Sequence, residues 1–333
     1  QITDWLKFNY TMRFTRQDYK RPATLTSSLY SDMARQGWPV LPLYDPNGYY
    51  YDAPSPALGL AEGGVDKTQT DNTYHQIGLA IEPIKNWVTH IDFNYRIQSA
   101  NRHWDSQMRY NHDVNGNPYV YSNSSNVHED YYKENYYNFN AYTEYTHTFN
   151  EIHNLHVMGG FQAENLKQTQ FGLQRNGIMF PDKPEVDLTT GLDYYGNEVT
   201  PSTNGSRNEW ATAGFFARVN YDYQGKYLVE ANVRADGTSR FRKGNQWKTF
   251  PSVSVGWNIA RESFFEPIND LIGTLKLRAS YGSLGNQNTT NWYQTFQTMT
   301  VGSSDGTWLM NGKKPNTATA PGLVSTTLTW ETI

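Results

Sequence analysis

Histidines and carboxylates are the residues of this sequence whose types and spacing could support catalysis or metal binding. His153 and His156 have the spacing of a metal-binding pair, but they lie beside a predicted short turn, where a turn or aromatic-belt histidine is the simpler interpretation. The sequence contains no HExxH, nucleophile elbow, P-loop or GxGxxG motif. The number of Asp and Glu residues by itself does not exclude the pair of catalytic carboxylates that a glycosidase uses. We therefore expect a protein that is not an enzyme, with no catalytic residue and no cofactor.

Three segments place aspartate or asparagine before glycine, next to aromatic residues. They are residues 44–50, 113–119 and 193–197. This composition is a hairpin-turn signal, because Asp and Asn bond to their own backbone and Gly accepts a positive φ. The spacing of Asp45, Asn47 and Asp52 also resembles part of a calcium loop, but the full ligand set of such a loop is missing. We expect folded hairpins, with calcium as the alternative.

Aromatic residues are dense in the segments that do not alternate. They offer stacking faces beside Asn, Asp and Gln, a combination that suits sugar rings. The alternative is that they hold the loops together or contact a partner protein. The candidates for ligand or partner contact are Trp38, Trp104, Tyr110, Tyr119, Tyr121, Tyr131, Trp292 and Trp308.

Composition removes several classes of protein. The 333 residues have a mean hydropathy of -0.74 and no apolar run near the length of a membrane helix. A chain with no cysteine has no disulfide scaffold, thiolate metal site or Cys nucleophile. Net charge -4 and pI ≈ 6.1 argue against nucleic-acid binding. The aromatic content of 15% argues against disorder.

Apolar and polar residues alternate with a period of two along the whole chain, which predicts β-strands. About nine such segments are present, and residues 328–333 read as the start of a tenth. The segments are residues 2–14, 77–81, 87–97, 139–149, 155–163, 213–223, 227–235, 253–259 and 275–281. Both ends of the sequence read as strand, so we expect a piece of a larger all-β structure.

Charged residues follow the same alternation and fall on the polar face. Four of them, Arg218, Arg234, Asp236 and Arg278, are candidates to line an interior. Two structures fit such a pattern: a soluble β-sandwich with its apolar face inward, and a membrane barrel with its apolar face toward lipid. The longest windows run to roughly 10–14 residues, which exceeds the usual soluble strand of about 5–6. The links also alternate, with short ones at 82–86, 150–153 and 224–226 and long ones at 15–73, 99–135, 165–209 and 283–326, as in outer-membrane barrels.

One set of motifs resembles the SusC/RagA-type TonB-dependent outer-membrane transporters of Bacteroidetes. It comprises YLVEANVRADGTSRF at 227–241, FPSVSVGW at 250–257, ESF at 262–264, LKLRASYG at 275–282, GNQ at 285–287 and LTWE at 328–331. The resemblance implies a 22-stranded antiparallel transmembrane barrel, of which residues 1–333 would be a part. It also implies an N-terminal plug, a TonB box, a signal peptide and a terminal strand, all expected outside these residues.

The resemblance further implies a location in the cell outer membrane and uptake of oligosaccharide or peptide nutrients. The implied partners are a SusD-like surface lipoprotein, the TonB–ExbB–ExbD complex and outer-membrane lipid. Arg218, Arg234, Asp236 and Arg278 would then contact the plug or one another inside the lumen. A passive porin and a secreted glycan-binding β protein are the alternatives.

Overall fold

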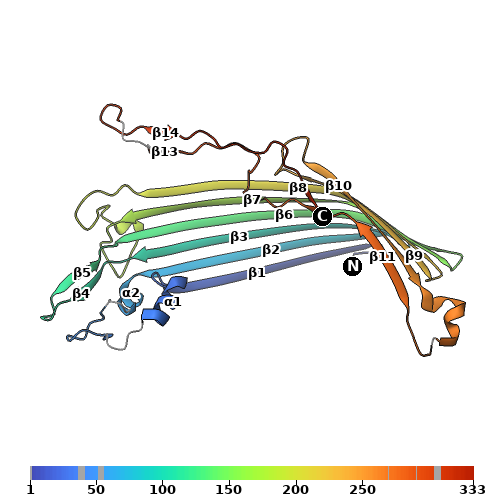
Figure 1. Cartoon of the computed structure of the whole chain (residues 1–333), viewed down its shortest axis with the longest axis horizontal. Helices are drawn as coiled ribbons and strands as arrows, with labels where there is room; N and C mark the ends of the chain where they lie inside the picture. Colours follow the sequence, from blue (N-terminus) through green and yellow to red (C-terminus); the bar gives the residue numbers. More distant parts are fainter. Residues whose placement is uncertain (1, 37–41, 52–55, 269, 290, 304–308) are drawn as a thin grey trace.

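Long antiparallel strands dominate the computed structural model, which describes residues 2–36, 42–51, 56–268, 270–289, 291–303 and 309–333. Within these ranges one sheet has nine strands, in the order β1-β2-β3-β6-β7-β8-β9-β10-β11 (Figure 1). Their bounds are β1 Leu6–Pro22, β2 Val65–Ile84, β3 Trp87–Ser106, β6 Asn126–Phe149, β7 His153–Asn176, β8 Ser202–Tyr223, β9 Tyr227–Thr238, β10 Trp247–Asn258 and β11 Lys276–Gly282. All neighbours in the sheet are antiparallel, so the chain runs up and down without a crossover.

The smaller elements lie in the links between these strands. The hairpin β4 Arg109–His112 and β5 Pro118–Ser122 projects from the β3–β6 link, and α1 Ser27–Gln36 and α2 Ala57–Glu62 belong to the β1–β2 link. The 3₁₀ helices are η1 Val186–Leu188, η2 Ile259–Arg261 and η3 Ser263–Ile268. After β11 come β12 Gly285–Asn286, β13 Val301–Ser303, β14 Asn316–Ala318 and β15 Glu331–Thr332. Within the described ranges, no helix has both the length and the apolar character needed to cross a membrane.

From β1 to β9, short links lie at one end of the sheet and long links at the other. The turn end, on the right of Figure 1, carries tight turns in which Asn86, Asn150 and Gln224 have positive φ values of 69°, 48° and 55°. Tight hairpins favour positive φ because such turns match the twist of the flanking strands. The opposite loop end carries α1, α2 and the β4–β5 hairpin. The predicted alternation of short and long links is therefore confirmed from β1 to β9, but not beyond it, where the β9–β10 link is shorter than the β10–β11 link.

The predicted starts of the long links were wrong. β1 continues to Pro22, β3 to Ser106 and β7 to Asn176, well inside the predicted links 15–73, 99–135 and 165–209. β6 and β7 each have 24 residues. Beyond the apolar stretch both faces of the sheet are polar, so the ladder goes on after the hydrophobic alternation has stopped.

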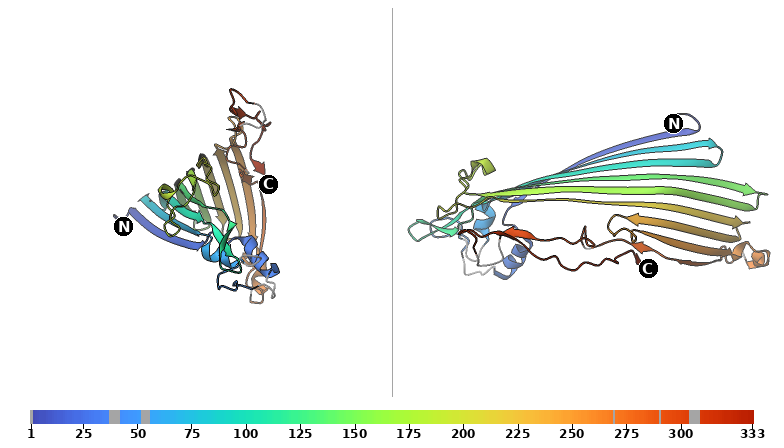
Figure 2. Two further views of the ribbon diagram at one scale, coloured as in Figure 1. Left: turned by 90° about the vertical axis from the view of Figure 1, so that its left-hand side faces the viewer. Right: turned by 90° about the horizontal axis from the view of Figure 1, so that it is seen from above.

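The two faces of the sheet differ in chemistry. The outer face carries exposed apolar side chains such as Met12, Phe93, Phe139, Phe215 and Val253. One row of register partners runs across it through Leu6, Ile81, Thr89, Thr143, Gly159, Ala217 and Val233. The inner face carries the alternate residues and is the concave side of the curved sheet (Figure 2). The hollows of the molecule described below lie on this side. Because apolar residues cover the convex side, burial within the chain does not account for this pattern.

Aromatic residues border the apolar band at the turn end. Tyr223 and Tyr227 stack at 6.3 Å between ring centroids, and the Tyr221 hydroxyl lies 2.7 Å from His153 Nδ1. Tyr221, Tyr223 and Tyr227 therefore form an aromatic border on the outer face beside the short turns. Amphipathic rings at this level are typical of a membrane–water boundary.

A small core forms where the C-terminal segment returns to the sheet. Phe241, Phe250 and Trp330 are buried against one another, with Leu328 packed beside them. The Trp330 Nε1–H donates to the Gln246 carbonyl at 2.7 Å. Next to this core β15 pairs with β12, which continues the line of β11. The prediction that residues 328–333 begin a further strand is confirmed.

Candidate functional site

The inner face near β8–β11 contains a hollow with a volume of 770 Å³. All four residues predicted to line an interior contribute to it: Arg218, Arg234, Asp236 and Arg278. Their positions follow from parity, since even-numbered residues of β8 to β11 face this side. The structure thus brings the four together. What they contact in the whole protein stays a prediction.

Each of these side chains has polar neighbours within the wall. Arg234 Nε donates to both carboxylate oxygens of Asp236, at 2.7 and 2.8 Å, and its Nη2 donates to Gln162 at 3.0 Å. Arg218 Nε donates to Asn232 Oδ1 at 2.5 Å. Arg278 Nη2 reaches Ser254 Oγ at 3.4 Å. The guanidinium groups are exposed and retain donors that can bind a neighbouring carboxylate or carbonyl.

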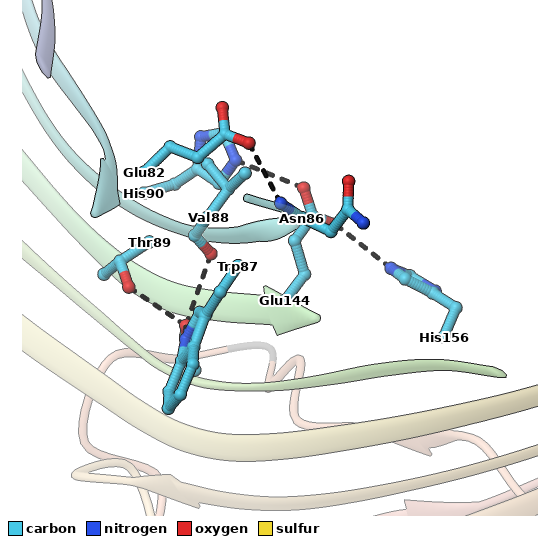
Figure 3. Close-up of polar contacts among 9 residues, drawn as sticks. Glu82, Asn86, Trp87, Val88, Thr89, His90, Glu144 and His156 are labelled. Atoms are coloured by element: carbon cyan, nitrogen blue, oxygen red, sulfur yellow. Dashed lines mark hydrogen bonds and ion pairs between the residues drawn. The ribbon is translucent and has the colours of Figure 1, made fainter. Parts of the chain in front are cut away.

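A histidine–glutamate network that the residue pattern did not predict lies on the same face, closer to the turn end. Glu144 on β6 stands between His90 on β3 and His156 on β7 (Figure 3), with Nε2–carboxylate distances of 3.2 Å on each side. The sequence did carry a signal for this network, because all three residues lie at even-numbered positions of strands that neighbour one another in the sheet, and so point to the same face. A second hollow of 330 Å³ begins at His156 and is lined by Glu230, Lys276 and Arg278 among others.

His153 and His156 do not form a metal site. His153 belongs to the outer face, where its ring lies 5.1 Å from the Tyr223 ring, whereas His156 lies on the inner face with Glu144. Both residues are in β7, and three residues along a strand reverse the side-chain direction. The belt interpretation therefore holds for His153, and His156 belongs to the inner face.

The aspartate–glycine segments are turns, as the sequence predicts. In one of them Asp113 Oδ1 accepts the backbone N–H of Asn115 at 2.8 Å and of Asn117 at 2.9 Å. Asp193 accepts from Tyr195 and Asn197 at 2.9 and 2.8 Å in the same way. Side-chain and backbone hydrogen bonds from Asn117 and Asn197 hold the pKa of Asp113 and Asp193 below the usual value.

The turn at residues 44–50 repeats this arrangement and packs against the turn at residues 113–119. Asp45 Oδ1 accepts the backbone N–H groups of Asn47 and Tyr49 at 2.8 and 3.0 Å, so this carboxylate serves a turn. The Asn47 side chain donates to the Asp113 carbonyl at 3.0 Å. Asp52, the remaining residue of the calcium hypothesis, lies outside the described residues.

The predicted loop aromatics do not form one surface. Trp104 is in β3 and stacks on His128 at 3.5 Å, on the inner side, whereas Tyr131 is in β6 on the outer side and stacks on Phe171 at 4.9 Å. Tyr110 belongs to β4, and Tyr119 and Tyr121 belong to β5. Trp292 lies beneath the Arg240 guanidinium at 5.8 Å. Trp38 and Trp308 lie outside the described residues.

Trp104 belongs to an ion network at the loop end of the inner face. Asp66, nearly buried, accepts Arg102 Nε and Nη2 at 2.9 and 3.0 Å and Arg21 Nε at 3.0 Å. The Arg102 guanidinium also lies 5.3 Å from the centre of the Trp104 ring. These contacts fix the strand extensions together above the apolar band, and Trp104 packs within them; its contact with a ligand or partner stays a prediction.

A curved antiparallel sheet with an apolar convex band, an aromatic border and a charged, hollow concave face is a segment of a transmembrane β-barrel wall. The family model described as TonB dependent receptor-like, beta-barrel matches residues 6–332, and the chain belongs to this family.

Several known proteins are similar to this chain. The TonB-dependent receptor P39 of Formosa agariphila is 32% identical over 226 residues, which cover 67% of this chain and 20% of that protein. The TonB-dependent receptor SusC of Bacteroides thetaiotaomicron is 26% identical over 302 residues, covering 86% of this chain and 29% of SusC. The predicted resemblance to SusC-type receptors is confirmed. The chain spans less than a third of the length of either relative.

A solved structure of the RagAB peptide transporter shares the fold. It superimposes with a TM-score of 0.72 at 18% identity and covers 100% of this chain and 36% of the other. At that identity the similarity concerns the fold alone. The names of all these proteins are those of receptors and transporters, which supports a role other than catalysis.

Proposed function

We propose that this chain is part of the barrel wall of an active importer in the cell outer membrane. The importer takes up oligosaccharide or peptide nutrients and is energised by the TonB–ExbB–ExbD complex. A SusD-like surface lipoprotein captures the substrate at the loop end and delivers it to the barrel. The observation that carries this proposal is the pairing of an apolar outer face with a charged, hollow inner face in a chain of the TonB-dependent receptor family.

Each part of the chain has a role in this proposal. The apolar band and its aromatic border contact lipid, and the side chains of the inner face line the water-filled path. The pairing of Arg234 with Asp236 leaves both signs of charge along the wall, which favours passage of polar oligomers over selection of one ion charge. Extended strands and folded turns at the loop end provide a rigid surface for the lipoprotein.

The proposed substrate is an oligomer with many polar groups. A peptide is supported by the similar RagAB structure, which is described as a peptide transporter. An oligosaccharide is supported by exposed aromatic rings beside amide side chains at the loop end, including Tyr119 and Tyr121 on β5. Both classes present backbone or ring hydrogen-bonding groups that the inner arginines and asparagines can accommodate.

The test is uptake by the source bacterium with and without the full-length gene. Fluorescent casein peptides and fluorescent starch oligosaccharides serve as probes, and membrane fractionation locates the protein. We expect the gene product in the outer membrane and loss of uptake of one probe on deletion of the gene, of tonB or of the neighbouring lipoprotein gene. Uptake that persists without TonB would indicate a passive porin, and a soluble secreted product would overturn the proposal.

A further inference from the structure

Three potential metal ligands from different parts of the sequence meet on the outer side of the wall near the loop end. His103 on β3 and Glu129 on β6 are direct register partners. Glu185 comes from the β7–β8 link, next to η1. One ligand atom from each of the three residues lies within 4.8 Å of the other two. The cluster is about 15 Å beyond Ile97, the last apolar residue of β3 on this face, and therefore in water.

The charges at this place are unbalanced. His103 Nδ1 lies 2.5 Å from Glu129 Oε1. When protonated, this imidazole is the positive charge that faces the carboxylates of Glu129 and Glu185. Within the described parts of the chain, no lysine or arginine lies within ion-pair distance of Glu129 or Glu185. Lys67, the neighbour of His103 on β2, also makes no ion pair with them. Two carboxylates and one imidazole therefore converge with at most one positive charge, so a bound cation would offset their repulsion.

The backbone that carries Glu185 is already fixed against the wall. Gln107 Nε2 donates to the Pro181 carbonyl at 2.8 Å, and Ser125 receives the backbone N–H groups of Gly177 and Ile178 at 2.8 and 2.9 Å. The Leu188 N–H closes a turn onto the Glu185 carbonyl at 3.0 Å. Binding then requires ordering of side chains but little ordering of backbone, which lowers its entropic cost.

From this geometry we propose that His103, Glu129 and Glu185 bind a divalent transition-metal ion, for which Zn²⁺ is the best match. One imidazole nitrogen and two carboxylate oxygens suit zinc, with water as a fourth ligand. Calcium and magnesium prefer sets made of oxygen alone. Zinc bonds of about 2.0–2.2 Å place tetrahedral ligand atoms about 3.4 Å apart, so rotamer adjustments of roughly an ångström complete the site.

The bound ion clips the β7–β8 link to the ladder between β3 and β6. The link covers this part of the outer surface, and the clip holds it in one position. The site goes beyond the proposed import function and does not depend on it. Zinc binding would stand whether the barrel is energised or passive.

The test uses the full-length protein purified in detergent, stripped with EDTA and titrated with Zn²⁺ by calorimetry. We expect the wild type to bind one equivalent more than Glu185→Gln or His103→Ala, or to bind it at least about tenfold more tightly, because even outer-shell changes cost about 10–100-fold. Co²⁺ as a spectroscopic probe should give visible absorption that these variants lose. Hydrogen exchange in residues 179–189 should slow on zinc binding in the wild type.

Glu198→Gln is the matched control, because Glu198 is an exposed glutamate of the same link outside the cluster. It should bind zinc as the wild type does. Glu185→Gln changes an exposed side chain and leaves the fold intact, so it remains informative if His103→Ala does not fold. Equal zinc stoichiometry and affinity in the wild type and Glu185→Gln would overturn the proposal, as would a preference for Ca²⁺ over Zn²⁺.

Discussion

Placing a charge in the middle of the apolar band should destabilise the barrel in a way that depends on which face it enters. Ala217 of β8 is the test position, since it lies on the outer face beside Phe215 and Val219, both exposed. It is six residues from Ala211 and six from Tyr223, the two ends of the apolar stretch on this strand. At ~3.3 Å per residue and a tilt of ~40°, this puts Ala217 about 15 Å from either edge, at the bilayer midplane.

An arginine at the midplane of a barrel costs about 2–4 kcal/mol. Ala217→Arg should therefore lower the equilibrium constant for folding by about 30-fold to several hundred-fold. The assay is reversible urea unfolding of the full-length protein in lipid vesicles, followed by tryptophan fluorescence and by the heat-modifiable gel band. The chain already carries a guanidinium one residue away, at Arg218, but on the inner face.

Asn220→Arg provides the control on the same strand. Asn220 faces the inner hollow and is paired with Glu230 of β9, so an arginine there gains water and a carboxylate. We expect a change within about 1 kcal/mol. Equal loss of stability in the two variants would refute the assignment of the outer face to lipid.

Three further outcomes are expected. Asp66→Asn should weaken the loop-end ion network by about 1.5–3 kcal/mol. The lower end of this range is expected because both arginine partners are partly in water. Faster hydrogen exchange in residues 65–68 and 102–104 would report the loss, and unchanged exchange would count against it. The pKa of Asp113 is lowered, so its contribution to the turn is present above the ordinary aspartate pKa of about 3.9 and is lost as pH falls through the folded-state value. The protection factors of the 115 and 117 amides, corrected for the intrinsic exchange rate at each pH, should fall in acid in the wild type, and Asp113→Asn should lack this dependence on carboxyl ionisation. Trp330→Ala should cost the small C-terminal core about 3–5 kcal/mol and expose residues 284–333 to protease, and a wild-type cleavage rate would contradict that packing.

Hydrophobic alternation predicted the membrane part of this fold well, because there each residue meets either lipid or water. The nine segments identified in the sequence correspond in order to the nine strands of the sheet among the described residues. Arg218, Arg234, Asp236 and Arg278 were placed on one face by the same argument, and the structure brings them to one hollow. The pattern was sufficient because a step of one residue reverses the environment of a side chain.

The alternation could not predict the loop-end extensions, where both faces meet water. Trp104 and Tyr131 were assigned to a loop, yet both are in strands and point to opposite sides of the sheet. Contacts between segments that lie far apart in the chain also could not be predicted from the sequence. The meeting of Glu185 with His103 and Glu129 depends on how the β7–β8 link folds back on the wall, and residue spacing carries no signal of that.

The measurement that tests the central claim most directly is the accessibility of spin labels along β8. The 333 residues contain no cysteine, and once any cysteine elsewhere in the full-length protein has been replaced by serine, single cysteines introduced at positions 213–221 give a defined label at each site of this segment. In the full-length protein in lipid vesicles, odd-numbered positions should be accessible to oxygen in the bilayer and even-numbered positions to a water-soluble nickel reagent. A period of two in opposite phase for the two reagents is the predicted result. Uniform accessibility to the water-soluble reagent on both faces would contradict a membrane wall.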